Sequence, residues 1–385
     1  MQKYSTSKTI RLLPLIAIVL VVGCAPTFKK FKQVPAAQSG FLQHRVQSNG
    51  NAVLESQLLL DTLLYDRKLN GGIAAQVVGN SEFIIVPTYN KRLYFLNPAN
   101  GEEKTSLVAE SALGSAAALA GELLYYAEES GGDMLTCFNL INAKKSWSLA
   151  LRDPQSAPIL SGDELFICAR DGKVYSVNRW TGAVNWTYES HNQIYASPAA
   201  DSSIVVFGTD HGDIVALNRT NGQKLWSFHA AGSIFAQALV TDRVYCAAGD
   251  GAMYALDHST GELIWKFETT AAIHTTPVQV DNRLLFGGDD KMVHCLNSND
   301  GGVLWTYATN GIIQSSPIAL GSTFVVANSA GNIYQFNLEG SPLKQFSIRQ
   351  SIEATPALID GKLFVVTAQR RIFAFSTIPA TATSP

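Results

Sequence analysis

A single pattern recurs along the chain at a nearly constant distance, and it restricts the fold more than any other feature. An apolar segment ends in Asp or Asn, a short turn follows, and a tryptophan with apolar neighbours comes next. Successive tryptophans stand at an almost equal spacing: Trp147, Trp186, Trp226, Trp265 and Trp305. A fixed period of this length indicates one supersecondary unit that is repeated along the chain.

Each unit has the pattern of four short antiparallel strands. Residues 251–256 alternate between apolar and polar, 257–261 have turn chemistry, and 263–267 are apolar and aromatic again. A further pair of strand-like runs stands at 276–280 and 283–287. The turn needs a residue with a positive φ, and glycine adopts this conformation without steric cost. Four units have a glycine at this position: Gly182, Gly222, Gly261 and Gly301. Four short strands in every repeat are typical of a propeller blade.

The number of blades follows from the apolar third strand and the polar residue, Asn, Asp or Ser, at which it ends. This pattern occurs eight times, with the polar residue at positions 97, 139, 178, 218, 257, 297, 337 and 376. The eighth unit has no fourth strand after Ser376, and residues 60–69 fit the vacancy because Tyr65 aligns with Trp265. Strand exchange between the two ends would remove both open edges. We therefore predict an all-β fold over residues 59–378: an eight-bladed β-propeller of four-stranded antiparallel blades, closed by an N-terminal strand in the last blade.

The first residues have the layout of an export signal. Residues 1–23 place three basic side chains before a short apolar run and end in Val21-Val22-Gly23-Cys24. This junction resembles the lipobox of bacterial lipoproteins, which implies lipidation of Cys24; the alternative is an uncleaved N-terminal anchor. Ala25 lacks the Asp that favours inner-membrane retention in enterobacterial lipoproteins, so the resemblance implies the outer membrane, facing the periplasm. We expect residues 24–58 to be a tether and 379–385 a disordered tail.

Charge and cysteine positions exclude several kinds of site. Removal of residues 1–23 leaves a net charge of about −5, which gives no electrostatic footprint for nucleic acid. Cys137 and Cys295 occupy equivalent positions in blades on opposite sides of the ring, and Cys168 and Cys246 are separated by a whole blade. A disulfide requires Cα atoms within roughly 7 Å. We predict four buried, unpaired thiols, and their scattered spacing predicts no metal site.

The repeat resembles that of the pyrroloquinoline-quinone (PQQ)-type propellers, in which the tryptophan packs against the neighbouring blade. With a lipobox in front, the chain is most similar to the propeller lipoproteins of the outer-membrane β-barrel assembly machinery. The resemblance implies an outer-membrane-anchored periplasmic scaffold without a cofactor, which binds envelope proteins during assembly of outer-membrane β-barrel proteins. Two blades depart from the pattern, with Thr105 and Lys344 in place of the tryptophan, so they must pack differently. The connections at 189–195 and 268–274 are shorter than the extended loops of those lipoproteins.

Two other functions remain open. One is a periplasmic ligand-sensing propeller, and the other is a PQQ-dependent dehydrogenase. Quinoprotein dehydrogenases carry adjacent cysteines over their cofactor, whereas this chain has no Cys-Cys pair. The chain also lacks the common nucleophile, metalloprotease and phosphate-loop motifs. Its histidines are interpreted as solvated turn residues, and we predict that the protein is not an enzyme.

A candidate docking surface comes from positions that are equivalent between blades. Seven residues stand three positions before the start of a first strand: Ser115, Gln155, Tyr195, Phe235, His274, Gln314 and Glu353. The fold would gather them around the mouth of the central channel. The residue type at these positions varies from blade to blade, whereas positions with a structural role tend to keep one residue type in every repeat. We hypothesise that Tyr195, Phe235 and His274 form one docking sector for an envelope partner. The preceding Ile194, Ile234 and Ile273 either extend this sector as an apolar patch or pack inward.

Overall fold

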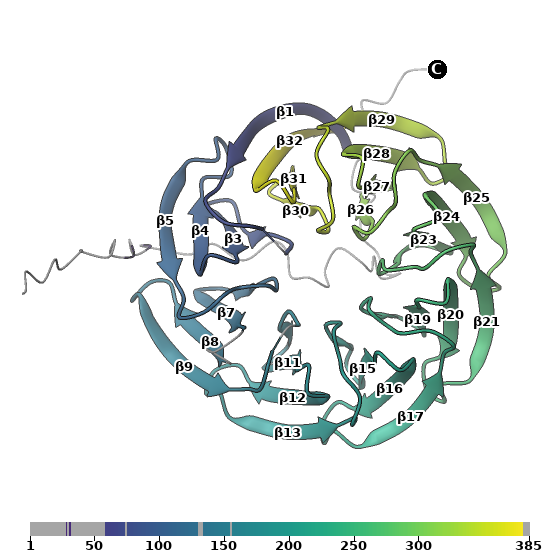
Figure 1. Ribbon diagram of the computed structural model, residues 1–385, viewed down its shortest axis with the longest axis horizontal. Coiled ribbons are helices and arrows are strands. Elements are labelled where there is room, and N and C mark those ends of the chain that lie inside the picture. The colour runs from purple at the N-terminus through teal and green to yellow at the C-terminus, as the bar shows by residue number, and fades with distance from the viewer. Residues whose placement is uncertain are drawn as a thin grey trace, which may run out of the picture.

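The computed structural model describes Phe28, Phe31 and residues 58–73, 75–129, 134–154 and 156–379. Eight antiparallel sheets of four strands each are arranged in a ring around one axis, that of the predicted central channel (Figure 1), which confirms the predicted eight-bladed propeller. The export signal, Cys24 and the predicted tail from residue 380 lie outside the described residues.

The blades are numbered in chain order, and their strands are given from the channel outwards. Blade 1 contains β2 (Val78–Gly79), β3 (Ile84–Thr88), β4 (Arg92–Leu96) and β5 (Glu103–Val108). Blade 2 contains β6 (Ala118–Ala120), β7 (Leu123–Glu128), β8 (Met134–Asn139) and β9 (Lys144–Ala150). Blade 3 contains β10 (Ile159–Ser161), β11 (Glu164–Cys168), β12 (Lys173–Asn178) and β13 (Val184–Glu189). Blade 4 contains β14 (Ala199–Ala200), β15 (Ile204–Gly208), β16 (Asp213–Asn218) and β17 (Lys224–His229).

The second half of the ring continues the same order. Blade 5 contains β18 (Leu239–Val240), β19 (Arg243–Ala247), β20 (Ala252–Asp257) and β21 (Leu263–Glu268). Blade 6 contains β22 (Val278–Val280), β23 (Arg283–Gly287), β24 (Met292–Asn297) and β25 (Val303–Ala308). Blade 7 contains β26 (Ile318–Leu320), β27 (Thr323–Ala327), β28 (Asn332–Asn337) and β29 (Pro342–Ser347). Blade 8 contains β30 (Ala357–Ile359), β31 (Lys362–Val366), β32 (Arg371–Pro379) and β1 (Leu58–Lys68).

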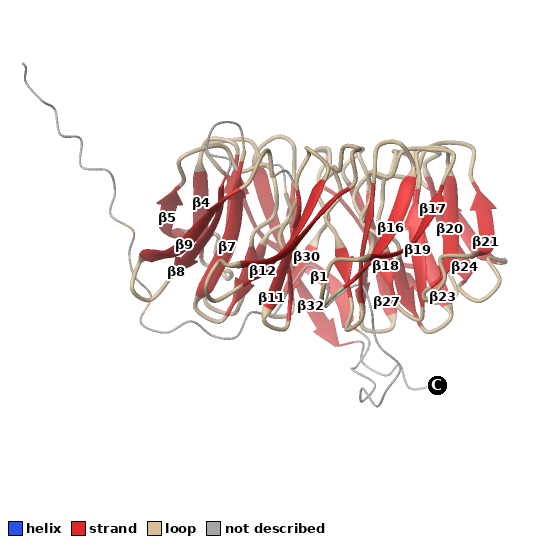
Figure 2. Ribbon diagram, turned by 90° about the horizontal axis from the view of Figure 1, so that it is seen from below, coloured by secondary structure: helices blue, strands red, loops and turns tan. Residues whose placement is uncertain are grey.

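The strands run between two loop-bearing faces of a flat disc (Figure 2). One face carries the turn between the third and fourth strand of each blade, such as residues 179–183, and we call it the turn face. The other face carries the connections from one blade to the next, such as residues 190–198, and we call it the mouth face. In the part of the chain that the structure describes, no helix is long and apolar enough to cross a bilayer.

The core is a continuous layer between neighbouring blades. One cluster joins Val206 and Trp226 of blade 4 to Val244 and Tyr254 of blade 5, and similar clusters follow around the ring. The second and third strands of each blade are therefore apolar on both sides, since both sides face another blade. This explains why their sequences are almost continuously hydrophobic.

The tryptophans hold neighbouring blades together in the same way at five junctions. Each indole lies over the turn glycine of the next blade, and a Cβ added to that glycine would lie 2.5–2.8 Å from the ring. The indole N–H also donates to a backbone carbonyl of the same turn at 2.7–3.0 Å. The junctions pair Trp147 with Gly182, Trp186 with Gly222, Trp226 with Gly261, Trp265 with Gly301, and Trp305 with Gly340. The glycine is thus needed for its positive φ and also for the space that the ring fills.

A β-bulge in every blade directs this contact. In blade 4, Ala216 is paired with Trp226 and Leu217 with Lys224, so Leu225 is left over between them. The bulge turns the tryptophan towards the next blade and turns Leu225 towards solvent, where half of its side chain is exposed. The exposed Ile264 and Leu304 occupy the same position in blades 5 and 6.

The ends of the chain close the ring as predicted. Strand β1 pairs antiparallel with β32, and the purple β1 lies beside the yellow β32 in Figure 1. Their bounds extend one residue beyond the predicted 59 and 378. Tyr65 takes the place of the tryptophan, because a Cβ on Gly101 of blade 1 would lie 2.5 Å from its ring. The side chain of Arg371 also pairs with that of Asp66.

The blade 7 junction, where Lys344 replaces the tryptophan, is packed by the beginning of β1. Leu60 is fully buried there between blades 7 and 8. Gln335, which is paired with Lys344, accepts a hydrogen bond from the Leu60 amide at 2.8 Å and donates to the Leu58 carbonyl at 2.6 Å. The closing strand therefore also replaces the missing indole.

The predicted state of the cysteines is confirmed. Cys137, Cys168, Cys246 and Cys295 are all buried and unpaired. Burial raises the pKa of the Cys137 thiol to about 11 and that of Cys295 to about 12, so both remain protonated and unreactive at neutral pH.

The tryptophan–glycine contact predicts a graded response to added methyl groups. Gly222→Ala should destabilise the protein by more than about 2 kcal/mol, because the new Cβ meets both a positive φ and the Trp186 ring. Gly121→Ala is the matched control, since Gly121 also has a positive φ but has nothing within 4 Å of its Cβ position. It should cost about 1 kcal/mol. Equal losses in urea unfolding would contradict a role for the ring contact.

The closing strand predicts a second stability effect. Tyr65→Ala should lower the free energy of unfolding by about 3 kcal/mol, because it empties the contact over Gly101 that joins the chain ends. Leu64→Ala is the control, because the Leu64 side chain is 42% exposed.

A chain that starts at residue 72 should aggregate or melt well below the full mature protein, since two strand edges are left open. A monomeric truncated protein with an unchanged melting temperature would rule out this closure.

Candidate functional site at the channel mouth

Three of the equivalent positions singled out in the sequence, Ser115, Tyr195 and Glu353, line one space on the mouth face. A cavity of about 220 Å³ is lined by the entries to the first strands of five blades. Its lining includes Gln76, Ser115, Ser156, Tyr195, Ser197, Glu353 and Thr355. Gln155 lies outside the described residues. The repeat therefore converts positions that are a full repeat apart in sequence into neighbours at the channel mouth.

Tyr195, Phe235 and His274 form a continuous row of rings, which we call the aromatic row. The ring centroids of Tyr195 and Phe235 are 5.6 Å apart with an edge-to-face angle of 66°. Those of Phe235 and His274 are 6.1 Å apart. Phe235 in the centre is 43% exposed, whereas a buried position would be expected for a phenylalanine with only a structural role. The row is a solvent-facing apolar surface that spans blades 4, 5 and 6.

Charged groups flank both ends of the aromatic row. The Arg170 guanidinium lies 5.2 Å from the centroid of the Tyr195 ring. At the other end, Nε2 of His274 lies 3.5 Å from Oδ2 of Asp289, and Gln314 donates to the other oxygen of that carboxylate at 3.4 Å. The row therefore has the arrangement of aromatic anchors within a polar rim.

The isoleucines before each ring do not extend this surface. Ile194, Ile234 and Ile273 are each only 1% exposed. A Cβ on Gly208 would clash with Ile234, so this side chain fills the space that the glycine leaves at the end of β15. The alternative of a wider apolar patch is wrong, because these side chains pack between the blades.

Three acidic side chains stand in the part of the mouth next to the Tyr195 end of the aromatic row. Burial and the charge of Asp153 raise the pKa of Glu129, which lies against Gly114. Burial and the nearby Glu129 and Glu353 raise the pKa of Tyr89. These groups come from blades 1, 2 and 8 and from the connection before blade 3. We call Glu129, Asp153 and Glu353 the acidic sector.

Sequence reasoning singled out Glu353 but missed Glu129 and Asp153, because the three acids do not occupy one repeated position. A signal was present in blade 2, where Glu128 stands at the end of the second strand while the other blades have the shorter Thr, Ala, Gly or Asn at that position. Glu128 is buried and accepts the backbone amides of Glu110 and Ser111 at 2.7 and 2.9 Å. An acid in that position therefore has a local structural partner, and only its neighbour Glu129 faces the mouth.

Two histidines differ from the expected solvated turn residues. His258 is partly buried, and its Nε2 lies 2.7 Å from Oδ2 of Asp201 in the preceding blade. His294 is buried in β24, stacks on Phe286 at 5.2 Å and lies 2.8 Å from the Asp290 carboxylate. Both histidines are therefore held by an acidic partner within the folded ring and are not solvated turn residues. The sequence did not reveal this because the partner acids lie in other strands or turns.

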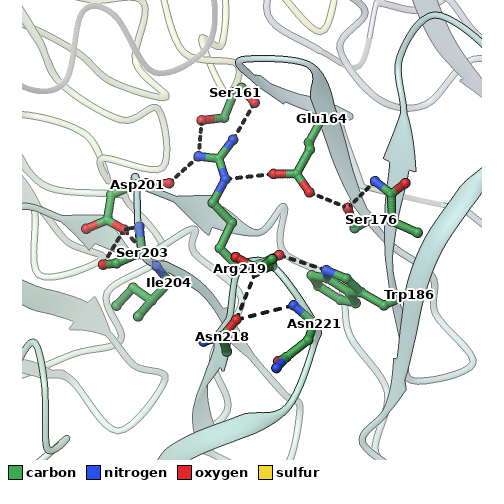
Figure 3. A network of polar contacts seen from close by, with 12 residues as sticks. Ser161, Glu164, Ser176, Trp186, Asp201, Ser203, Ile204, Asn218, Arg219 and Asn221 are labelled. Atoms are coloured by element: carbon green, nitrogen blue, oxygen red, sulfur yellow. Dashed lines mark hydrogen bonds and ion pairs between the residues drawn. The ribbon is translucent and has the colours of Figure 1, made fainter.

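A polar network around Arg219 lies on the turn face, at the opposite ends of the strands from the mouth face. Figure 3 shows its contacts. Arg219 donates from Nε to Glu164 at 2.7 Å, and from its terminal nitrogens to the hydroxyl and carbonyl of Ser161 and to the carbonyl of Asp201. Its own carbonyl accepts the Trp186 indole N–H at 2.7 Å. Four of the five guanidinium N–H groups are thus used: three donate to Glu164 and Ser161 of blade 3, and one donates to Asp201 of the same blade 4. This network holds the blades together and is not a ligand site.

The potential metal ligands are dispersed over the ring. Within the described ranges, no three His, Cys, Asp or Glu side chains are grouped so that they could hold a metal ion.

Comparisons with known proteins place the fold and the repeat in context. The family model described as outer membrane protein assembly factor BamB matches residues 89–234 and 229–382. The assembly factor BamB of Shewanella oneidensis is 26% identical over 167 residues, which are 38% of this chain and 40% of that protein. The chain thus spans less than half the length of this curated relative.

Solved structures share the architecture at low sequence identity. BamB from Moraxella catarrhalis superposes with a TM-score of 0.68 and 17% identity, covering 83% of this chain and all of that one. The computationally designed Ika8 protein gives a TM-score of 0.73 and 15% identity, covering 80% and 97% of the two chains. The quinohemoprotein alcohol dehydrogenase ADHIIG from Pseudomonas putida HK5 gives 0.66 and 12%, covering 86% and 78%. At these identities the likeness concerns the fold.

Proposed function

Because the chain belongs to the family described as outer membrane protein assembly factor BamB, we propose that it is a periplasmic protein–protein interaction scaffold in the assembly of outer-membrane proteins. The aromatic row at the channel mouth is the observation that carries this proposal. It presents three rings from three blades on a rigid frame, with the central ring almost half exposed. Such preordered aromatic anchors bind a protein partner at low conformational cost.

The charge distribution defines the chemistry of the partner. The acidic sector begins beside the aromatic row, because the Arg170 guanidinium lies over the Tyr195 ring and 3.9 Å from the Asp153 carboxylate. Tyr195 of the row and Glu353 of the acidic sector line the same cavity. A partner that offers an apolar side chain to the row and basic side chains to the acids would match both surfaces. The complementary charges would mainly favour specificity and the rate of association.

A catalytic role is not favoured by the arrangement of reactive groups. The four thiols in the described part of the chain are separately buried, and burial raises their pKa values. The polar network around Arg219 is used between blades. We infer a non-enzymatic function, and an absence of turnover with PQQ, calcium, an alcohol and a dye acceptor is the expected result.

The cavity supports a second candidate function, the sensing of a small ligand. Oγ of Ser115, which is only 8% exposed, and Oε1 of Gln76 line the cavity without a protein hydrogen-bond partner. A ligand with hydroxyl or amide groups would satisfy both atoms. If this is the function, Ser115→Ala should abolish calorimetric binding of the ligand while recovery of envelope proteins stays unchanged.

The docking proposal predicts the effect of removing two rings. Tyr195→Ala/Phe235→Ala should reduce recovery of partner proteins from solubilised envelope at least tenfold, because the central anchors are lost. The melting temperature should stay within a few degrees, since both side chains are partly solvated. Trp180→Ala is the control, because it removes a 53% exposed ring from the turn face and should leave recovery unchanged. Undiminished recovery by the double variant would reject the aromatic row as the docking surface.

The lipid-anchor proposal has an independent test. We propose that Cys24 is acylated and holds the propeller at the outer membrane. Cys24→Ala should move the protein to the soluble periplasmic fraction or leave the signal unprocessed, as read by fractionation and mass spectrometry. A processed variant that still floats with membranes would contradict acylation at Cys24.

A further inference from the structure

The junction between blades 1 and 2 lacks the tryptophan–glycine contact of the repeat. Thr105 stands at the tryptophan position of β5, and Ala143 stands at the glycine position of the next turn, with a positive φ of 55°. The residue opposite the tryptophan is small in the five regular blades: Cys137, Ser176, Ala216, Ala255 and Cys295. In blade 1 this residue is Phe95. The junction is therefore built for a different filling group.

Two phenylalanines from the N-terminal segment provide that group. Phe28 lies edge-on to Phe95 of blade 1 and to Phe138 of blade 2, with centroids 5.3 Å apart in both cases. Phe31 lies 4.5 Å from Phe83 and is only 7% exposed. Both rings belong to one hydrophobic cluster that includes core residues of the two blades. Part of the stretch expected to be a tether thus contributes to the propeller core.

The backbone of the same segment replaces the indole N–H. The amide of Phe31 donates to the carbonyl of Leu140 at 3.4 Å. Leu140 follows Asn139 in the turn of blade 2, as Arg219 follows Asn218 in blade 4, and the Arg219 carbonyl accepts the Trp186 indole. Ring packing and hydrogen bond are therefore both reproduced by a segment that is distant in sequence from Thr105.

We propose that this segment is an intramolecular clip that fixes the membrane anchor at the rim between blades 1 and 2. The inference rests on the lipid anchor of the proposed function. Cys24 and Phe28 are four positions apart, so their Cα atoms are separated by at most about 14 Å. An acyl chain on Cys24 would hold this rim beside the bilayer, while a free tether that ran from Cys24 to β1 would allow any orientation. The sequence around Phe28 and Phe31 contains Lys29, Lys30 and Lys32, and anionic headgroups attract basic side chains.

The clip is tested first in the soluble Cys24→Ala mature chain by limited trypsin cleavage. Phe28→Ala/Phe31→Ala should speed cleavage after Lys29, Lys30 and Lys32 at least tenfold, because the docked backbone is released. Phe235→Ala removes a ring from the mouth instead and should leave the rate unchanged. Equal rates in the wild type and the double variant would overturn the clip.

A second variant restores the regular contact and covers the case in which the first one unfolds. Phe95→Ala/Thr105→Trp/Ala143→Gly gives the junction the small residue, indole and glycine of the other blades. The new indole should expel the segment, so cleavage after the three lysines should accelerate by the same factor while the melting temperature is retained. A folded triple variant that still protects these lysines would show that the segment does not occupy the tryptophan site.

The orientation is tested with the acylated chain on vesicles of phosphatidylethanolamine and phosphatidylglycerol that carry an energy acceptor on their headgroups. A donor dye is placed at Asn142→Cys in blade 2 or at the equivalent Asp300→Cys in blade 6, directly across the ring. Transfer should be stronger from position 142, and Phe28→Ala/Phe31→Ala should remove the difference. Equal transfer in the unmodified segment would overturn the fixed orientation. Absence of transfer at both positions would overturn the lipid anchor, while the cleavage experiment still decides the clip.

Discussion

The packing of an indole over a glycine of the next blade is the contact on which the ring depends. It occurs at five junctions with nearly the same geometry, and Tyr65 over Gly101 gives a sixth version at the closure. A blade of four short strands cannot bury both of its faces alone, so each blade is stable only when its neighbours cover it. The bulge before each tryptophan, the small residue opposite it and the glycine beneath it all serve this one contact. The three junctions without an indole, including the one that Tyr65 fills, are all packed by the N-terminal part of the chain.

Most of the architecture could be predicted from the sequence because the repeat is local and periodic. The five tryptophans established the period, and the alignment of Tyr65 with Trp265 located the closing strand. The clip could not be predicted in this way, because Phe28 and Phe31 stand in a stretch without strand alternation and their partners are distant in sequence. Phe95 was a usable signal, since it is the bulky exception at a position that is otherwise small in the regular blades.

The candidate site was predictable only where it follows the repeat. Tyr195, Phe235 and His274 occupy one position in three successive blades, so the fold had to bring their side chains together. The acidic sector has no such common position, because Glu129 comes from a hairpin and Asp153 from a connection between blades. The burial of Ile234 depends on the space above Gly208, which a pattern of apolar residues does not contain.

The pairing of β1 with β32 also has a consequence for the order in which the molecule is made. Leu58 and Pro379 are direct partners although they are separated by most of the chain. During synthesis, the first strand appears long before its only sheet partner, so blade 8 is the last blade to be completed. Closing a loop of this length has a high entropic cost, which makes it a slow step in folding. Until the last strand arrives, the apolar residues of β1 and the side of blade 1 that later faces blade 8 stay uncovered, and this is the interval in which a chaperone would be of use.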